Sequence, residues 1–474
     1  MDLIYAVTDP KLTFSCYTDL KYFNSTKVNH ATAYTSLLAL AVFRQVSEYV
    51  KGDKVKASEV FTPGKFPVHT FVDDHLRDKK DQLLDTLEAG AMLISISGPS
   101  KSGKTVFIEE CLGRTSLIQV TGSGVTQPSD LWMRVFDMVG TEMPVAISRA
   151  TSTQSAVGGK GAVEGGILVA KAKAEVSINK GITEAETTTA SLGSDCLQLL
   201  IRELANTDLV VFIDDFHYIP SDVQVEVAQQ IKEAIRNNVK FICASVPYHA
   251  DDVIRSNPDL RGRVFSIDFE YWGGETLKKI AYKGFPELGI YYKSSAVEKL
   301  VAEAAGSPQL MQYLCLNACY ELGVREKTEV KIELLNEPDI HENICRRTVQ
   351  STNYGSVVEL MKEGPKTRGS DRNVYLTKFG WDGDVYRLLT KALSVDPPKL
   401  TFRYNSLSER ILGMCQNGGP SGSSITSACS HSAKIVNDSA VGGRIVEWDG
   451  EHDVFDIRDP YFLFYLRWSD MVDS

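Results

Sequence analysis

The chain has 474 residues, which is enough for two or three domains that each bury a core of their own. Apolar residues make up 43% and charged residues 24% of it, the composition of an ordinary soluble globular protein. The formal net charge of -10 at pH 7 excludes a chain that is drawn as a whole to nucleic acid or to anionic membranes, although a local basic face is compatible with it.

The nine cysteines are odd in number and lack the paired spacing of a zinc site, which predicts free thiols in a reducing compartment. Cys315 and Cys319 lie on a predicted helix, and we expect them to pack in a core rather than to bind a metal. The first residues, MDLIYAVTDPK, lack the basic region of a signal peptide. The apolar run at residues 35–43 is far shorter than the roughly 20 residues of a membrane-spanning helix. We therefore expect a cytoplasmic protein without a membrane partner.

Residues 1–57 are predicted to be a helical N-terminal segment without recognisable effector chemistry. Residues 58–274 alternate short apolar runs with amphipathic stretches, the pattern of a parallel sheet connected by helices. Ser194 and Ser221 are the expected N-caps of two of the helices. The predicted strands are residues 92–97, 116–122, 209–215, 239–246 and 263–269, and the predicted helices are residues 104–112, 128–140, 194–206 and 221–238. The sequence thus predicts an α/β nucleotide-binding core.

One segment of this core, residues 155–181, interrupts the pattern with glycines and then a strict alternation of apolar and polar side chains. It predicts a β-hairpin insertion. Its lysines and glutamates balance, which argues against a dedicated DNA clamp. A contact between subunits or a pore lining is the favoured role, contact with a substrate the second, and a membrane role the third.

Three segments follow the core. Residues 275–335 show helical patterns without strands between them and predict a small helical lid, and the polar residues 336–380 predict a connector. Residues 381–474 contain three predicted helices and a hairpin whose Asp449 and Gly450 suit a tight primed turn, which is the arrangement of a winged helix. The aromatic run DIRDPYFLFYLRWS is expected to form the core of the last helix rather than an exposed docking patch.

The octapeptide GPSKSGKT at residues 98–105 matches the phosphate-loop pattern and lies between a predicted strand and a predicted helix. Its glycines allow successive N–H groups to point at phosphate oxygens, and the following helix adds its positive end. Lys104 is expected to reach the terminal phosphates, and the Thr105 hydroxyl to bind Mg²⁺. The predicted phosphate contacts are Gly98, Pro99, Ser100, Lys101, Ser102, Gly103, Lys104, Thr105 and Val106.

A second, independent signal is the apolar strand LVVFIDD, which ends in Asp214 and Asp215. Two carboxylates at the end of a buried strand need a partner. Asp214 is expected to hold Mg²⁺, and Asp215 to orient or deprotonate the attacking water. Together with the phosphate loop they predict Mg²⁺-ATP as the ligand and ATP hydrolysis as the reaction.

The order of these motifs, followed by NPDLRGRVFSIDF, GSPQL and a winged helix, resembles the STAND and AAA+ ATPases, in particular their origin-recognition-like and archaeal-ATPase relatives. The resemblance covers roughly residues 58–474. It implies that Phe71 or Val72 touches adenine and that Pro308 packs on it. It also implies that Arg261 or Arg263 is an arginine finger for a neighbouring subunit.

The sequence departs from this family at two positions. An arginine that often follows the fourth strand is missing, and Ser245 is the candidate polar sensor of the terminal phosphate there. Many members have Glu where Asp215 stands, and the shorter carboxylate either still places the attacking water or makes turnover slow.

These features give three hypotheses for function. The first is an oligomerising ATPase switch, for which the resemblance implies a role in bacterial stress or anti-phage defence and a separate effector protein. The second is a DNA-handling ATPase of the initiator or transposition-regulator type, and the third is a nucleotide-binding scaffold with little turnover. The predicted DNA face is thin, which favours the switch. It comprises Ser424, Ser427, Ser430, His431, Lys434 and Arg444.

Overall fold

The computed structural model describes residues 54–141, 196–246, 260, 262–366, 371–439 and 444–472. The predicted insertion at 155–181, most of the N-terminal segment, Ser194 and Arg261 lie outside these residues. Within the described part of the chain, no helix is long and apolar enough to cross a membrane.

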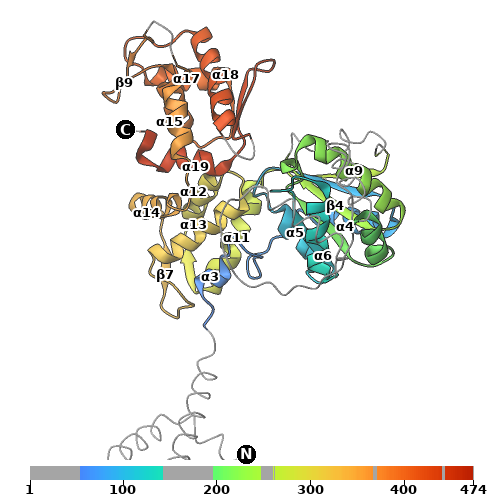
Figure 1. Ribbon diagram of the computed structural model, residues 1–474. Coiled ribbons are helices and arrows are strands. Elements are labelled where there is room, and N and C mark those ends of the chain that lie inside the picture. Colours follow the sequence, from blue (N-terminus) through green and yellow to red (C-terminus); the bar gives the residue numbers. More distant parts are fainter. Residues whose placement is uncertain are drawn as a thin grey trace, which may run out of the picture. The chain divides into compact units, whose positions relative to one another are not determined.

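The core is a five-stranded sheet in the order β2-β3-β4-β1-β5, in which every pair of neighbouring strands is parallel. This confirms the predicted α/β fold (Figure 1). The strands are β1 (Leu93–Ser97), β2 (Leu117–Thr121), β3 (Val210–Asp214), β4 (Lys240–Ser245) and β5 (Val264–Asp268), each within a predicted apolar run. The central strands are apolar along most of their length because helices cover both faces of the sheet.

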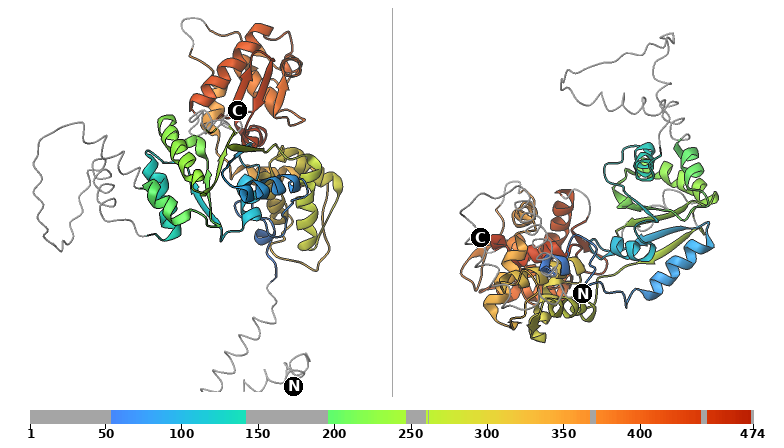
Figure 2. Two further views of the ribbon diagram at one scale, coloured as in Figure 1. Left: turned by 90° about the vertical axis from the view of Figure 1, so that its right-hand side faces the viewer. Right: turned by 90° about the horizontal axis from the view of Figure 1, so that it is seen from below.

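Successive residues of each strand point their side chains to opposite faces of the sheet. On one face, Val211 and Ile213 of β3 pack with α6 (Pro128–Val139), α9 (Ser221–Arg236) and the helix at residues 196–204. On the other face, Phe212 packs with α4 (Arg77–Ala89) and α5 (Lys104–Leu112). Figure 2 shows these two helix layers on either side of the sheet. The prediction of Ser221 as an N-cap is wrong, because Pro220 holds the cap position and Ser221 is the first helical residue.

The lid consists of α11 (Gly274–Glu287), α12 (Ser294–Ala304) and α13 (Pro308–Glu321). The expectation that no strands occur here is wrong: β6 (Ile290–Tyr292) and β7 (Ile332–Leu334) form a parallel pair. Strands of three residues are too short to show a two-residue period in the sequence. The short helix α3 (Ala57–Val60) packs on α13.

The segment predicted as a polar connector is also structured. It contains α14 (Pro338–Val349), which packs on α13, and α15 (Gly355–Glu363), which packs on α16 (Val385–Ser394). Each helix buries only two or three side chains, so the apolar signal in the sequence is weak.

The C-terminal domain contains the three predicted helices and an antiparallel sheet of three strands in the order β10-β12-β11. A further pair of two-residue strands, β8 (Tyr375–Leu376) and β9 (Asp382–Gly383), precedes α16. The final helix, α19 (Pro460–Trp468), buries Tyr461, Phe462 and Phe464, as predicted for the aromatic run, whereas Tyr465 and Trp468 are partly exposed. The other elements are α17 (Tyr404–Met414), α18 (Gly422–Ser439), β10 (Thr401–Arg403), β11 (Val446–Asp449), β12 (Val454–Ile457), α19 (Pro460–Trp468) and the short 3-10 helix η5 (Asp470–Val472).

The predicted two-residue turn at Asp449 and Gly450 is wrong. Asp449 pairs with Val454, so four residues connect the strands. The Asp449 carboxylate accepts hydrogen bonds from the N–H groups of Glu451 and His452, which favours the longer loop.

Candidate nucleotide site

The phosphate loop connects β1 to α5, as predicted. Gly103 has a φ of 95°, which side chains rarely adopt, and a Cβ on Gly98 would lie 2.4 Å from the Cβ of Phe269. Both glycines of the motif are therefore required by the backbone itself. Lys101 lies between them with a φ of 62°, in the left-handed region although it carries a side chain.

Lys104 is buried at the start of α5. Its Nζ donates hydrogen bonds to the carbonyl oxygens of Gly98 and Pro99, at 2.7 and 2.9 Å. Burial lowers the pKa of this ammonium to about 8, although Asp214 and Asp215 oppose the shift. A buried cation that donates hydrogen bonds to loop carbonyls is suited to an anionic ligand.

Thr105 and Asp214 meet across the sheet edge. The Thr105 hydroxyl donates a hydrogen bond of 2.8 Å to Oδ2 of Asp214. Burial raises the pKa of the Asp214 carboxyl, and the bond from Thr105 opposes that shift. A hydroxyl and a carboxylate beside a phosphate loop are the oxygen donors that Mg²⁺ prefers, so this pair fits the predicted metal site. The described residues contain no separate cluster of three or more potential metal ligands.

Asp215 follows β3 with a φ of 55° and a half-buried carboxylate. Burial raises the pKa of this carboxyl, whereas Lys104 lowers it. The backbone at Asp215 packs so closely on Gly122 that a Cβ there would lie 2.6 Å from the Asp215 carbonyl oxygen. The turn that presents this carboxylate is thus fixed by its surroundings.

A cavity of about 990 Å³ opens beside the loop. The structure brings most of the predicted nucleotide residues together around it: Pro99, Ser100, Lys101, Gly103, Lys104, Thr105, Val106, Asp214, Asp215, Phe71, Val72 and Pro308. Gly98 contributes a carbonyl oxygen to Lys104. The Ser102 hydroxyl is buried and has no hydrogen-bond partner among the described residues, so it is able to bond to a ligand of the loop.

The predicted residues Ser245 and Arg263 do not line the cavity. Ser245 ends β4 and is buried, but its neighbour Val246, not Ser245, lines the cavity. Arg263 precedes β5 and lies at the amino edge of the sheet, since β5 begins opposite Leu93 whereas the phosphate loop follows Ser97. In its own chain, Arg263 is therefore remote from the loop.

Sequence reasoning missed the aromatic residues that follow β5. The Trp272 indole N–H donates to the carbonyl oxygen of Ser102 at 3.0 Å, and its ring lies 4.4 Å from that of His75. The Tyr271 hydroxyl donates to the carbonyl oxygen of Arg458 at 2.7 Å. The sequence YWGG at the end of a predicted strand was the available signal.

Sequence reasoning also missed Gln312. Its side chain accepts from the N–H of Thr62 at 3.1 Å and donates to the Thr70 hydroxyl at 2.7 Å. These bonds connect the lid helix α13 to the segment that carries Phe71 and Val72.

A parallel sheet with a phosphate loop after β1 and a carboxylate after β3, with β4 between these two strands, defines an α/β P-loop fold. No protein-family model matches the sequence, and no curated protein matches it. Among solved structures, the chain is similar to a Cdc6 protein of Pyrobaculum aerophilum, with 13% identity and a TM-score of 0.39 over 89% of this chain and 99% of that one.

Two further solved structures are similar to the chain. One is a Walker-type ATPase of Pyrococcus abyssi, with 13% identity and a TM-score of 0.45 over 82% of this chain and 95% of that one. The other is the ORC2 protein of Aeropyrum pernix in complexes with ADPNP and ADP, with 11% identity and a TM-score of 0.45 over 88% of this chain and 97% of that one.

Proposed function

We propose that this chain binds Mg²⁺-ATP at the phosphate loop and hydrolyses it slowly to ADP and phosphate. The observation that carries the proposal is the hydrogen bond of 2.8 Å between Thr105 and Asp214, beside the buried Lys104. Loop N–H groups and Lys104 would hold the phosphates. Thr105 and Asp214 would hold Mg²⁺, which offsets the negative charge on the phosphate oxygens.

Asp215 is the candidate base. Its carboxylate lines the same cavity, and burial raises its pKa, which makes the group a better proton acceptor. An aspartate reaches less far than a glutamate, which is the reason to expect slow turnover. Phe71, Val72 and Pro308 line the same cavity and offer apolar contacts to the adenine ring.

Phosphate release and binding of fluorescent ATP separate these roles. Lys104→Ala is expected to lose nucleotide binding, and Asp215→Asn to keep binding but lose phosphate release. Asp208→Asn is the matched control, because the Asp208 side chain is fully exposed and distant from the cavity lining. Binding by wild type without phosphate release would leave a nucleotide-binding scaffold, and no binding would refute the proposal.

We further propose that ATP drives assembly of a STAND/AAA+-like switch in which the C-terminal domain is a winged helix. Three observations support it: α19 packs on α12 and α14 of the lid side, Tyr271 contacts Arg458, and Arg263 lies away from its own phosphate loop. An arginine in that position can act on a phosphate only in another copy of the chain. Arg261 is the neighbouring candidate.

Mass photometry with and without ATP tests the assembly. Arg263→Ala is expected to weaken ATP-dependent assembly and turnover while ATP binding persists. Arg236→Ala, at the exposed end of α9, is the control. If Arg263→Ala leaves both assembly and turnover intact, Arg263 is not the arginine finger.

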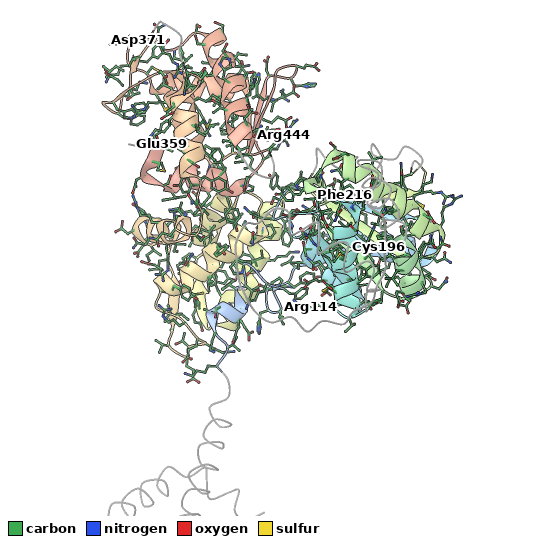
Figure 3. All side chains as sticks on the ribbon, in the orientation of Figure 1. Arg114, Cys196, Phe216, Glu359, Asp371 and Arg444 are labelled. Atoms are coloured by element: carbon green, nitrogen blue, oxygen red, sulfur yellow. The ribbon has the colours of Figure 1, made fainter. Side chains whose placement is uncertain are left out.

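DNA handling is the alternative, and the exposed face of α18 is the observation in its favour. Ser427, Ser430, His431 and Lys434 are exposed there. Arg444, however, forms an ion pair of 3.1 Å with Glu447 and lines the nucleotide cavity (Figure 3 labels Arg444). Salt-dependent duplex binding that is lost in Lys434→Ala would favour this alternative over the switch.

A further inference from the structure

Lys101 is the one loop cation that the phosphate-loop pattern does not require. Its Nζ lies 3.5 Å from Oδ2 of Asp459 and 4.0 Å from the centroid of the Tyr461 ring. Both partners belong to the C-terminal domain, where Asp459 is the N-cap residue of α19. The side chain of a phosphate-loop residue is therefore held by the C-terminal domain.

Asp459 is itself held in place from several sides. Its Oδ1 accepts a hydrogen bond of 2.9 Å from the N–H of Tyr461, and its Oδ2 accepts one from the Tyr354 hydroxyl. Arg458 precedes Asp459 in the chain, and its carbonyl oxygen accepts the hydrogen bond from the Tyr271 hydroxyl. The carboxylate is largely buried, at 17% exposure, and it lines the same cavity as Lys104 and Thr105.

A carboxylate in this place opposes a nucleotide in two ways. It repels the negative charges of a triphosphate directly, and it holds the Lys101 ammonium that could otherwise contact a phosphate oxygen. Neither effect requires a change in the fold.

We propose that Asp459 is a positioning residue: it competes with the triphosphate for the Lys101 ammonium and thereby lowers the affinity of the loop for ATP. The C-terminal domain thus sets nucleotide affinity through one ion pair. This inference rests on the proposed binding of ATP at the phosphate loop.

Asp459→Asn in the full-length chain is the decisive variant. Asn is as good an N-cap as Asp, so its amide oxygen can keep the bond from the Tyr461 N–H while its amide nitrogen donates to the Tyr354 hydroxyl oxygen. The helix start is preserved while the charge is removed. The dissociation constant of fluorescent Mg²⁺-ATP is expected to fall about three- to tenfold at low salt, and this gain is expected to shrink in high salt. An unchanged thermal melting curve would show that the fold is intact.

The same substitution in a Lys101→Met background gives the specific readout. If Asp459 acts through Lys101, most of the gain in affinity disappears there. Asp470→Asn is the matched control, because the exposed Asp470 pairs with Arg346 and neither residue lines the cavity. It is expected to leave the affinity unchanged.

The outcomes separate the two proposals. A wild-type chain that does not bind Mg²⁺-ATP refutes the proposed function and this inference with it. A wild-type chain that binds, with an Asp459→Asn variant of equal affinity, refutes the inference alone. An equal gain in the Lys101→Met background also refutes it, because Asp459 would then act independently of Lys101.

Discussion

The two ends of α19 make very different contacts. At the C-terminal end, Arg467 forms a bidentate ion pair with Glu303 of α12, with N–O distances of 2.7 and 2.9 Å. Each of these two side chains is only 6% exposed. At the N-terminal end, Asp459 meets Lys101 at 3.5 Å, with the lysine 31% exposed. The difference suggests a helix fixed to the lid and only loosely held by the phosphate loop.

The buried end should carry the larger stability. Arg467→Ala removes one partner of a buried pair and leaves Glu303 without its counter-ion, so the free energy of unfolding is expected to fall by about 3–5 kcal/mol. Denaturant unfolding measures this. Arg346→Ala, which removes exposed ion pairs with Glu342 and Asp470, is the control and should cost about 0–1 kcal/mol. Equal losses for both variants would break the contrast between the two ends of α19.

The lid contact of α19 and the phosphate loop near its other end should also differ in their response to pH. Arg467 keeps its charge, since its partner carboxylates raise its already high pKa. Lys104, in the phosphate loop, has a pKa of about 8 because it is buried. Its charged form binds phosphate, so the affinity for ATP should be constant below about pH 7.5 and fall up to about tenfold per pH unit above pH 8.

Titration of fluorescent ATP between pH 7 and pH 9 measures this fall. The Lys104→Arg variant, if it binds, should lose the pH dependence because its guanidinium stays protonated. Equal wild-type affinity at pH 7 and pH 9 would contradict the lowered pKa of Lys104.

The phosphate loop was predictable from the sequence, whereas both contacts of α19 were not. Gly98, Lys104, Thr105 and Asp214 belong to two local patterns whose spacing follows from one strand-loop-helix unit and one strand end. Lys101 and Asp459 are 358 residues apart in numbering, and no local pattern connects them. Long-range pairs of this kind depend on how the lid and the C-terminal domain fold back on the core.

The elements of the fold also divide into those that were predictable from local sequence and those that were not. The parallel sheet was predicted because its strands are apolar along most of their length, and helices α6 and α9 because their apolar periods are clear. The strands β6 and β7 and the helix α14 escaped prediction because few of their side chains are buried. Tertiary contacts, rather than the hydrophobic pattern, specify these elements.

The contact of Tyr271 with Arg458 should contribute less to stability than the Arg467 contact and more than the Lys101 contact. Tyr271→Phe removes the hydrogen bond to the Arg458 carbonyl oxygen while keeping the ring, so the free energy of unfolding should fall by about 1 kcal/mol. Thermal or denaturant unfolding provides the measurement. Tyr291→Phe, at a side chain that is 57% exposed, is the control and should be neutral. A loss as large as that of Arg467→Ala would mean that the loop side of α19 is not the weaker one.

The smallest effect is expected at Lys101. Removal of its ion pair with Asp459 should cost less than about 1 kcal/mol, because the pair is long and partly exposed. Its φ of 62° adds a second contribution: glycine accepts the left-handed region without the steric cost that alanine incurs there. Lys101→Gly should therefore be more stable than Lys101→Ala by about 0.5 kcal/mol, although both lose the same ion pair. Denaturant unfolding of the two variants measures the difference. If Lys101→Ala is the more stable variant, residue 101 does not adopt the left-handed conformation in the folded protein. The contact between Lys101 and Asp459, which depends on that conformation, would then be contradicted as well.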